Sequence, residues 1–385
     1  MSESLRQSLR MLYVHGLLFV PFVGVMASRV AFPLYVLELG GSALDAGLIS
    51  AVNHLPTVLS YNVGVVQARA GYRRLLAIGA LCGGAGLLMP YFFPGLAMLY
   101  AAALFSGIWS LFVLAPTQSL VGLLSAPQDV ARNYSHYNVL AWMTGFLGPL
   151  AAGYSIEGVG YRLAFVLLAS GALATLLMLA FWHRVIPALP RSEGVRPSLR
   201  ATLSDRRMLM VMLAASVLQI GMDMFPFFLP IYGHSLGFSP SHIGILVAVA
   251  SISAVAVCLV LPKLVTRFGE LPLLGGSLML SGAGFALMPL FESFVPLLVV
   301  SLLYGLGIGG GQPLTTMLAF KRAQKGAEGA AMGLRLLFTS VTKVAAPALF
   351  GGMAAALGLP AVLLTIGGVL GLAGWRARRD SQASA

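Results

Sequence analysis

A few ionisable side chains lie inside long apolar stretches of this 385-residue chain. Asp223 is the only acid well inside such a stretch, and Arg29, Arg335 and Lys343 are cations in comparable positions. A charge at the centre of a bilayer costs about 2.5–3.5 kcal/mol on insertion scales, so it is kept where it faces a cavity or a partner. Burial raises the pKa of a carboxyl group and a nearby cation lowers it. These residues therefore predict proton transfer and recognition of a charged solute.

Polar and aromatic residues lie three or four positions from these charged residues, so they share a helix face with them. Gln219, Asp223 and Phe227 share one helix face, and the other stripes have the same 3–4 periodicity. His54 fits either a proton acceptor or a hydrogen-bonded packing residue, and Arg335 fits either a substrate ligand or a side chain that reaches the membrane surface. The candidate substrate-binding residues are Arg29, His54, Tyr61, Tyr137, Asn138, Trp142, Gln219, Asp223, Arg335 and Lys343. The candidate proton-coupling residues are Asp223, Arg29 and His54.

The composition places these residues in a membrane protein. Apolar residues make up 58 % of the chain and charged residues only 9 %, whereas a soluble protein is about 25 % charged. This composition excludes a soluble enzyme, a disordered chain and a coiled coil. The sequence predicts an all-α protein with twelve membrane helices. Their approximate limits are 12–37, 46–66, 75–93, 96–120, 134–154, 163–182, 208–232, 243–264, 271–291, 294–320, 332–354 and 360–375.

The positive charges predict how the chain is oriented. The formal net charge of +12 would by itself suggest nucleic acid or anionic lipid as a partner. Twenty of the 24 cations, however, lie at the termini and in every second connection, and the remaining connections hold only Arg162. The positive-inside rule therefore predicts that both termini are cytoplasmic. We expect a multi-pass protein of the inner (plasma) membrane that binds no nucleic acid.

An internal repeat divides the predicted spans into two groups. The segment that begins at Phe32 aligns without a gap on the segment that begins at Leu229, at an offset of 197. Arg69 and Gly71 fall on Arg267 and Gly269 at nearly the same offset. Two further pairs are Pro149 with Pro347 and Gly160 with Gly358. The repeat predicts a six-helix half at 1–182, a cytoplasmic linker at 183–207 and a second six-helix half at 208–385.

Several motifs resemble those of the major facilitator transporters. The run from Gly64 to Arg74 resembles the family signature GxxxDRxGRR, but it has Ala68 in place of the acid and Tyr72 before the arginine pair. The sequence around Gly148 and Pro149 is similar to the GPxxGG motif of antiporters. Candidate gating residues are Gly64, Arg69, Gly71, Arg73, Arg74, Gly148, Pro149, Arg267, Gly269 and Pro347.

The resemblance implies alternating access, with the polar stripes meeting around one pocket between the halves. It places Asp223 and Arg29 on facing helices, either as a proton-coupling pair or as a permanent ion pair. We expect proton-coupled efflux of a small organic solute that is anionic or amphipathic. Uptake of an organic anion by symport and flipping of a lysolipid or glycolipid are the alternatives.

The remaining motifs predict no other chemistry. Gly305 to Gly310 contains GxGxxG, but no strand precedes it, so the glycines indicate helix packing rather than a dinucleotide site. Cys82 and Cys258 have no metal-binding spacing, and the chain has no Walker A loop. We therefore expect a monomeric non-enzyme without a metal or cofactor that uses a proton gradient.

Overall fold

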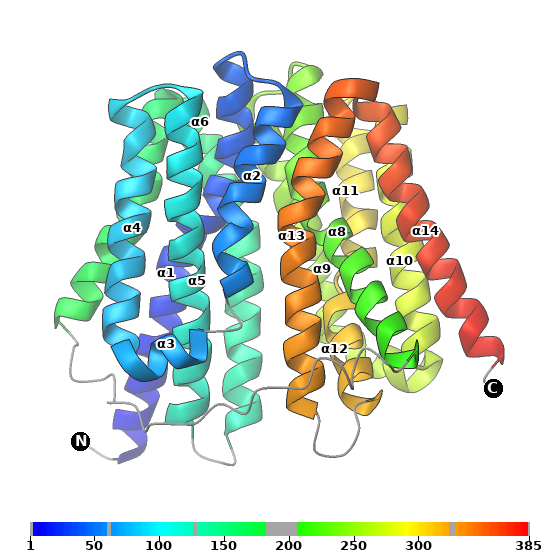
Figure 1. The fold of residues 1–385 in the computed structure, drawn as a ribbon, viewed down its shortest axis with the longest axis horizontal. Coiled ribbons are helices and arrows are strands. Elements are labelled where there is room, and N and C mark those ends of the chain that lie inside the picture. Colours follow the sequence, from blue (N-terminus) through cyan, green and yellow to red (C-terminus); the bar gives the residue numbers. More distant parts are fainter. Residues whose placement is uncertain (1–2, 60–62, 126–128, 182–205, 323–327, 384–385) are drawn as a thin grey trace. The chain divides into compact units, whose positions relative to one another are not determined.

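A computed structural model describes residues 3–59, 63–125, 129–181, 206–322 and 328–383. Nearly all of these residues are helical, and none of them belongs to a strand (Figure 1). The helices are α1 (Glu3–Glu38), α2 (Ala43–Val58), α3 (Val63–Ala70), α4 (Tyr72–Phe92), α5 (Leu96–Leu124), α6 (Val130–Phe181), α8 (Arg206–Ser235), α9 (Pro240–Phe268), α10 (Glu270–Leu287), α11 (Phe294–Ile308), α12 (Gly311–Arg322), α13 (Glu328–Leu357) and α14 (Leu359–Ala383).

Helix length and composition confirm a multi-pass membrane protein. In the described residues, ten helical stretches are long and apolar enough to cross a membrane. One of them, α6, is two helices that meet at Gly160, where the backbone leaves helical geometry. The predicted span 46–66 corresponds to α2 and α3, which flank residues outside the described ranges. The count of twelve spans and the side of the termini stay predictions, and the predicted linker 183–207 lies almost wholly outside the described residues.

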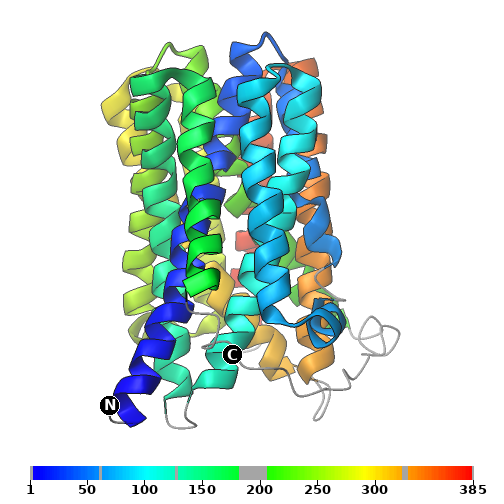
Figure 2. The same ribbon diagram turned by 90° about the vertical axis from the view of Figure 1, so that its left-hand side faces the viewer.

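The chain forms two compact units, each of which takes a short segment from the other part of the sequence. Unit 1 consists of Met1–Gly41, Val52–Gly194 and Ser239–Gly244. Unit 2 consists of Ser42–Ala51, Val195–Phe238 and Ile245–Ala385. In unit 1, α1 packs on α6 and α4 packs on α5, and α1 is a long helix that runs through the whole unit (Figure 2). In unit 2, α10 packs on α14 and α8 packs on α13.

The backbone reproduces the repeat found in the sequence. Among the described residues, six have a positive φ, and all six are glycines. They form three repeat-related pairs with φ between 76° and 84°, namely Gly40 with Gly237, Gly71 with Gly269, and Gly160 with Gly358. A side chain would strain this left-handed conformation, so glycine is required where the helices turn. The matching turns support a duplicated chain.

Glycines also allow the helices to approach closely within each unit. A Cβ atom on Gly305 would overlap the carbonyl oxygen of Ala250 on α9, and one on Gly307 would overlap Ser281 on α10. In unit 1, the ring of Trp109 occupies the space that a side chain at Gly83 would need. Helices in lipid associate through such close packing because lipid is as apolar as a leucine side chain. The prediction that the glycines of 305–310 pack helices together is confirmed.

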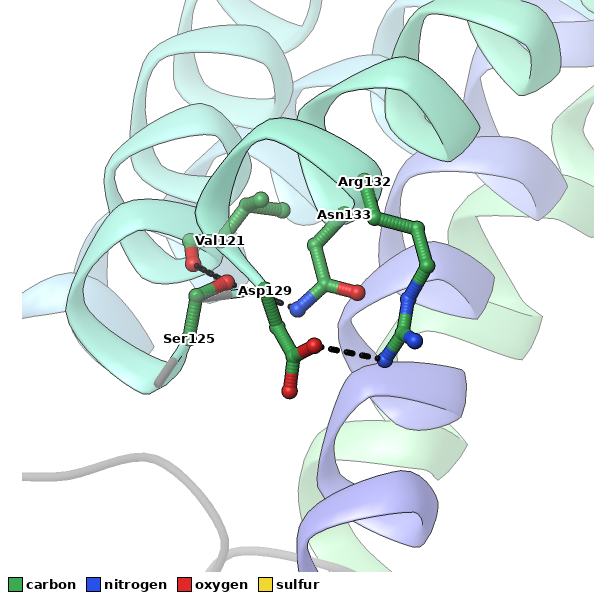
Figure 3. A network of polar contacts seen from close by, with 5 residues as sticks. All are labelled: Val121, Ser125, Asp129, Arg132 and Asn133. Carbon is green, nitrogen blue, oxygen red and sulfur yellow. Dashed lines mark hydrogen bonds and ion pairs between the residues drawn. The ribbon is translucent and has the colours of Figure 1, made fainter. Parts of the chain in front are cut away.

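Side-chain hydrogen bonds define the junction between α5 and α6. Figure 3 shows Ser125 donating from Oγ to the carbonyl of Val121 at 2.6 Å, while the Asn133 amide donates to Ser125 Oγ at 2.8 Å. Asp129 and Arg132 form an ion pair at 3.1 Å on the first turn of α6. These contacts tie the end of α5 to the start of α6.

Replacement of Gly305 by alanine tests the close packing. Gly305→Ala forces a methyl group against the Ala250 carbonyl, and overpacking of this kind costs about 1–3 kcal/mol. Gly368→Ala is the matched control because no atom lies within 4 Å of the added Cβ on α14. We expect the melting temperature of the detergent-solubilised protein to fall for Gly305→Ala and to stay level or rise for Gly368→Ala. Equal melting temperatures for the two variants would contradict the packing argument.

Candidate functional site: a buried acid and a buried arginine in unit 2

Asp223 is held on α8 by a neighbour on its own helix. Its side chain is 9 % exposed, and Oδ2 accepts a hydrogen bond of 2.7 Å from the Gln219 amide. Residues four apart lie on the same face of a helix, so Gln219 can donate without any distortion of α8. The predicted stripe of Gln219 and Asp223 therefore exists as a hydrogen-bonded pair, and it gives unit 2 a buried carboxyl group.

An aromatic cluster fixes the segment of α8 that carries Asp223. The rings of Phe225 and Tyr304 stack with centroids 3.7 Å apart and an angle of 2° between their planes, and Phe285 meets both rings edge-on. The Tyr304 hydroxyl donates a 2.8 Å hydrogen bond to the carbonyl of Gly221. This bond joins α11 to α8 two residues before the acid. Tyr304 is a core residue that positions Asp223, and its 3 % exposure leaves no surface for stacking on a solute.

Arg335 brings a cation into the same unit. It lies on α13, which packs on α8, and its side chain is 9 % exposed. Its Nε is buried and has no hydrogen-bond partner among the described residues. Thr339, on the next turn, donates its hydroxyl to the backbone carbonyl of Arg335. A buried donor without an acceptor is costly, so this group is suited to an acceptor that a ligand would bring.

The other predicted charged and polar residues have varied surroundings. Lys343 lies further along α13 and is half-buried, and Arg29 is half-buried on α1. His54 on α2 is 5 % exposed. Arg29 and His54 belong to unit 1 and Asp223 to unit 2, so the pairing of Arg29 with Asp223 stays a prediction. Tyr61 lies outside the described residues.

The predicted stripe on α6 divides into a core residue and two accessible ones. Tyr137 is 2 % exposed, and its hydroxyl lies 3.2 Å from both Thr117 Oγ1 and the Leu114 carbonyl on α5. It therefore packs α6 on α5 within unit 1. Asn138 is exposed and Trp142 is half-buried, so both retain surface that a solute can contact.

The candidate gating residues near the predicted cytoplasmic loops are surface groups at helix ends. Arg69, Arg73 and Arg74 are exposed, and Gly71 with φ 79° precedes the first residue of α4. At the repeat-related place, Arg267 lies over the ring of Phe268 at 5.3 Å and Gly269 precedes α10. Gly64 is part of α3. These positions confirm the expected turns and leave the gating role untested.

The two candidate gating prolines, Pro149 and Pro347, are contacted by glycines that correspond to each other in the repeat. A Cβ on Gly244 of α9 would overlap the carbonyl of Pro149 within unit 1, and one on Gly47 of α2 would overlap the carbonyl of Pro347 within unit 2. Gly148 fits tightly against Met26 of α1. Gly47 corresponds to Gly244 in the repeat, and Pro149 corresponds to Pro347. Each predicted gating proline therefore touches a helix segment from the other half of the sequence.

One polar contact at the same place was not foreseen. Glu157, in α6, accepts a 3.1 Å hydrogen bond from the backbone N–H of Ser241 in the first turn of α9. The residues are 84 positions apart, so no local pattern pairs them. The repeat offered one signal, because it places His242 where the first half has Asp45.

Comparison with known proteins agrees with this architecture. A family model described as Major Facilitator Superfamily matches residues 15–347. The chain belongs to the major facilitator superfamily. The quinolone resistance protein NorA of Staphylococcus aureus (strain MRSA252) is 22 % identical over 343 residues, which cover 87 % of each chain. Multidrug resistance protein 1 of Bacillus subtilis (strain 168) is 24 % identical over 345 residues, with the same coverage.

Solved structures share the fold of this transporter. The crystal structure of the nucleoside transporter NupG matches with a TM-score of 0.79 and 16 % identity over 96 % of this chain and 98 % of that one. A POT family transporter in complex with a thioalcohol-conjugated peptide matches with a TM-score of 0.80 and 13 % identity, over 97 % of this chain and 96 % of the other. The family match identifies a multi-pass membrane transporter, and these two structures share its fold.

A pair of substitutions tests the bond between Gln219 and Asp223. Gln219→Leu leaves a buried carboxyl group without its donor, which should lower stability by about 1–3 kcal/mol. The double variant Gln219→Leu/Asp223→Leu removes both polar groups and should lose less stability than Gln219→Leu alone. Thermal unfolding of the purified protein measures both. A double variant that is less stable than the single one would show that the pair does not act as a unit.

Proposed function

We propose that the transporter exports a small organic solute in exchange for protons. The observation that carries this proposal is Asp223, a carboxyl group that is nine-tenths buried in an apolar helix with one hydrogen-bond donor beside it. An ionisable group inside the membrane is costly to keep, and such groups mark the proton and substrate pathways of transporters. Asp223 is therefore the residue in unit 2 best suited to couple proton movement to transport.

In the proposed cycle, the proton and the solute compete for the same acid. Asp223 is protonated in one state, and in another it is ionised beside Arg29 or beside a bound solute. The two halves of the sequence, 1–182 and 208–385, rock against each other and expose the site to each side in turn. His54 is a further candidate for proton uptake.

Two observations, one from the relatives and one from a sequence motif, support export as the direction of transport. The relatives named for quinolone and multidrug resistance support export, and so does the partial antiporter motif at Gly148 and Pro149. The protein in this proposal is a monomer in the inner membrane with both termini cytoplasmic. It uses the proton gradient and no metal or cofactor.

Transport by Asp223→Asn protein tests the coupling. The amide has nearly the shape of the acid but cannot exchange a proton, so proton-driven movement of a fluorescent quinolone in proteoliposomes should fall to the level of empty vesicles. Glu292→Gln is the matched control because Glu292 is exposed, and it should transport like the parent. Accumulation of quinolone by Asp223→Asn protein against a gradient would show that another group couples transport to protons.

Arg335 supports a solute that carries a negative group. A guanidinium whose Nε has no partner in the described structure can bind a carboxylate at two points, while Asp223 on the neighbouring helix α8 suits an amine. Amphipathic zwitterions and organic anions are the solutes that fit this pair of charges. The same arginine favours the second candidate function, uptake of an organic anion together with protons.

Substitution of Arg335 tests the substrate class. Arg335→Gln should weaken binding of a zwitterionic quinolone at least tenfold, because a charged hydrogen bond contributes about 1.5–3 kcal/mol, and it should affect a cationic dye much less. The exposed Arg376 provides the control Arg376→Gln. Tryptophan-quenching titrations measure both affinities. Equal weakening for the zwitterion and the cation would contradict an anion-binding role.

A further inference from the structure

The first turns of α2 and α9 are repeat-related but are stabilised in different ways. In α2, the Ser42 N–H and hydroxyl donate to Asp45 Oδ2 at 2.8 and 2.7 Å, and the Asp45 N–H donates back to Ser42 Oγ at 3.2 Å. This reciprocal arrangement is a capping box, which satisfies free N–H groups and places a negative charge at the positive end of the helix. The start of α2 therefore needs no residue from another helix.

In α9, the corresponding carboxylate comes from a different helix. Ser239 occupies the position of Ser42 and its hydroxyl pairs with His242 Nδ1 at 2.9 Å, but the first turn of α9 contains no acid. The Glu157 carboxylate of α6 accepts the Ser241 N–H at 3.1 Å instead. Within the described residues, the negative charge that a helix start favours thus comes to α9 from Glu157 on another helix.

Close backbone packing surrounds this bond. A Cβ on Gly153, one turn before Glu157, would overlap the carbonyl of Pro240, and a Cβ on Gly244 would overlap the carbonyl of Pro149. Residues Ser239–Gly244 are part of unit 1, whereas α9 from Ile245 onward is part of unit 2. The helix passes from one compact unit to the other within a single turn of the Glu157 bond.

We propose that Glu157 is a latch that ties the first turn of α9 to α6 and sets how often this end of α9 is released. Release of the first turn of α9 from α6 must either break the Glu157 bond or bend α9 after Gly244, the last residue of α9 in unit 1. The first turn of α2 is capped by its own residue Asp45, so α2 keeps this cap when its end is released. The Glu157 latch therefore makes the two helix ends unequal, because release of α9 breaks a capping bond and release of α2 does not. This proposal concerns conformation alone and is independent of the solute and of proton coupling.

Cysteine labelling measures the release of α9. Ile243, two residues after Ser241, has an exposed fraction of 0 %, so a cysteine there reacts with a water-soluble maleimide only when the packing around the first turns of α9 opens. The background is Cys82→Ala/Cys258→Ala with Ile243→Cys, in lipid nanodiscs. Glu157→Ala should raise the labelling rate about fivefold, the factor expected for loss of one helix cap. An unchanged rate would overturn the proposal.

Two further variants separate a latch from an ordinary helix cap. His242→Asp rebuilds the capping box of α2 within α9, so Glu157→Ala/His242→Asp should regain the melting temperature that Glu157→Ala loses while its labelling stays fast. Asp45→Ala, the control in α2, should lower the melting temperature without faster labelling. The proposal fails if the double variant labels as slowly as the parent, or if Asp45→Ala accelerates labelling as much as Glu157→Ala.

Discussion

Lipid offers no hydrogen-bond partners, and the whole structure follows from this constraint. Every backbone N–H and C=O group within the membrane must be bonded inside the protein, so the spanning segments are helices. Burial of apolar surface gives little drive for helices to associate in lipid, and glycines such as Gly83 and Gly305 let them approach closely instead. The same constraint makes each buried charge expensive. Asp223 with its Gln219 donor, and Arg335 whose Nε has no partner among the described residues, are two such buried charged groups in unit 2.

The duplicated chain uses one geometry twice with different chemistry. Repeat-related turns keep the same positive-φ glycines, and Pro149 and Pro347 receive repeat-related glycines from α9 and α2. Two acids do not repeat, because Asp223 corresponds to Met26 and Asp45 to His242. Duplication thus supplies the framework, and the departures from it supply the candidate coupling acid and the cap from Glu157. In a family that transports by rocking two halves, such departures make the two halves unequal.

The sequence predicted the features that depend on local pattern or on the repeat. It identified the helical membrane class, the family, the paired turns at Gly71 and Gly269, and the stripe of Gln219 and Asp223. It could not predict how long-range packing uses a side chain. Tyr137 was a candidate for contact with a solute, yet its hydroxyl group bonds to the neighbouring helix α5 in the core. The bond of Glu157 to Ser241 joins residues far apart in sequence, and neither residue belongs to a recognisable motif.

Proton-coupled export requires protons and solute to move in opposite directions through one protein, and transport by the unmodified protein tests this directly. A quinolone gradient is imposed across proteoliposomes that hold a trapped pH-sensitive dye, with no initial difference in pH. We expect protons to move against the flow of quinolone, the dye to report this movement, and vesicles without protein to show none. Quinolone movement without any proton movement, or proton movement in the same direction as the quinolone, would contradict it.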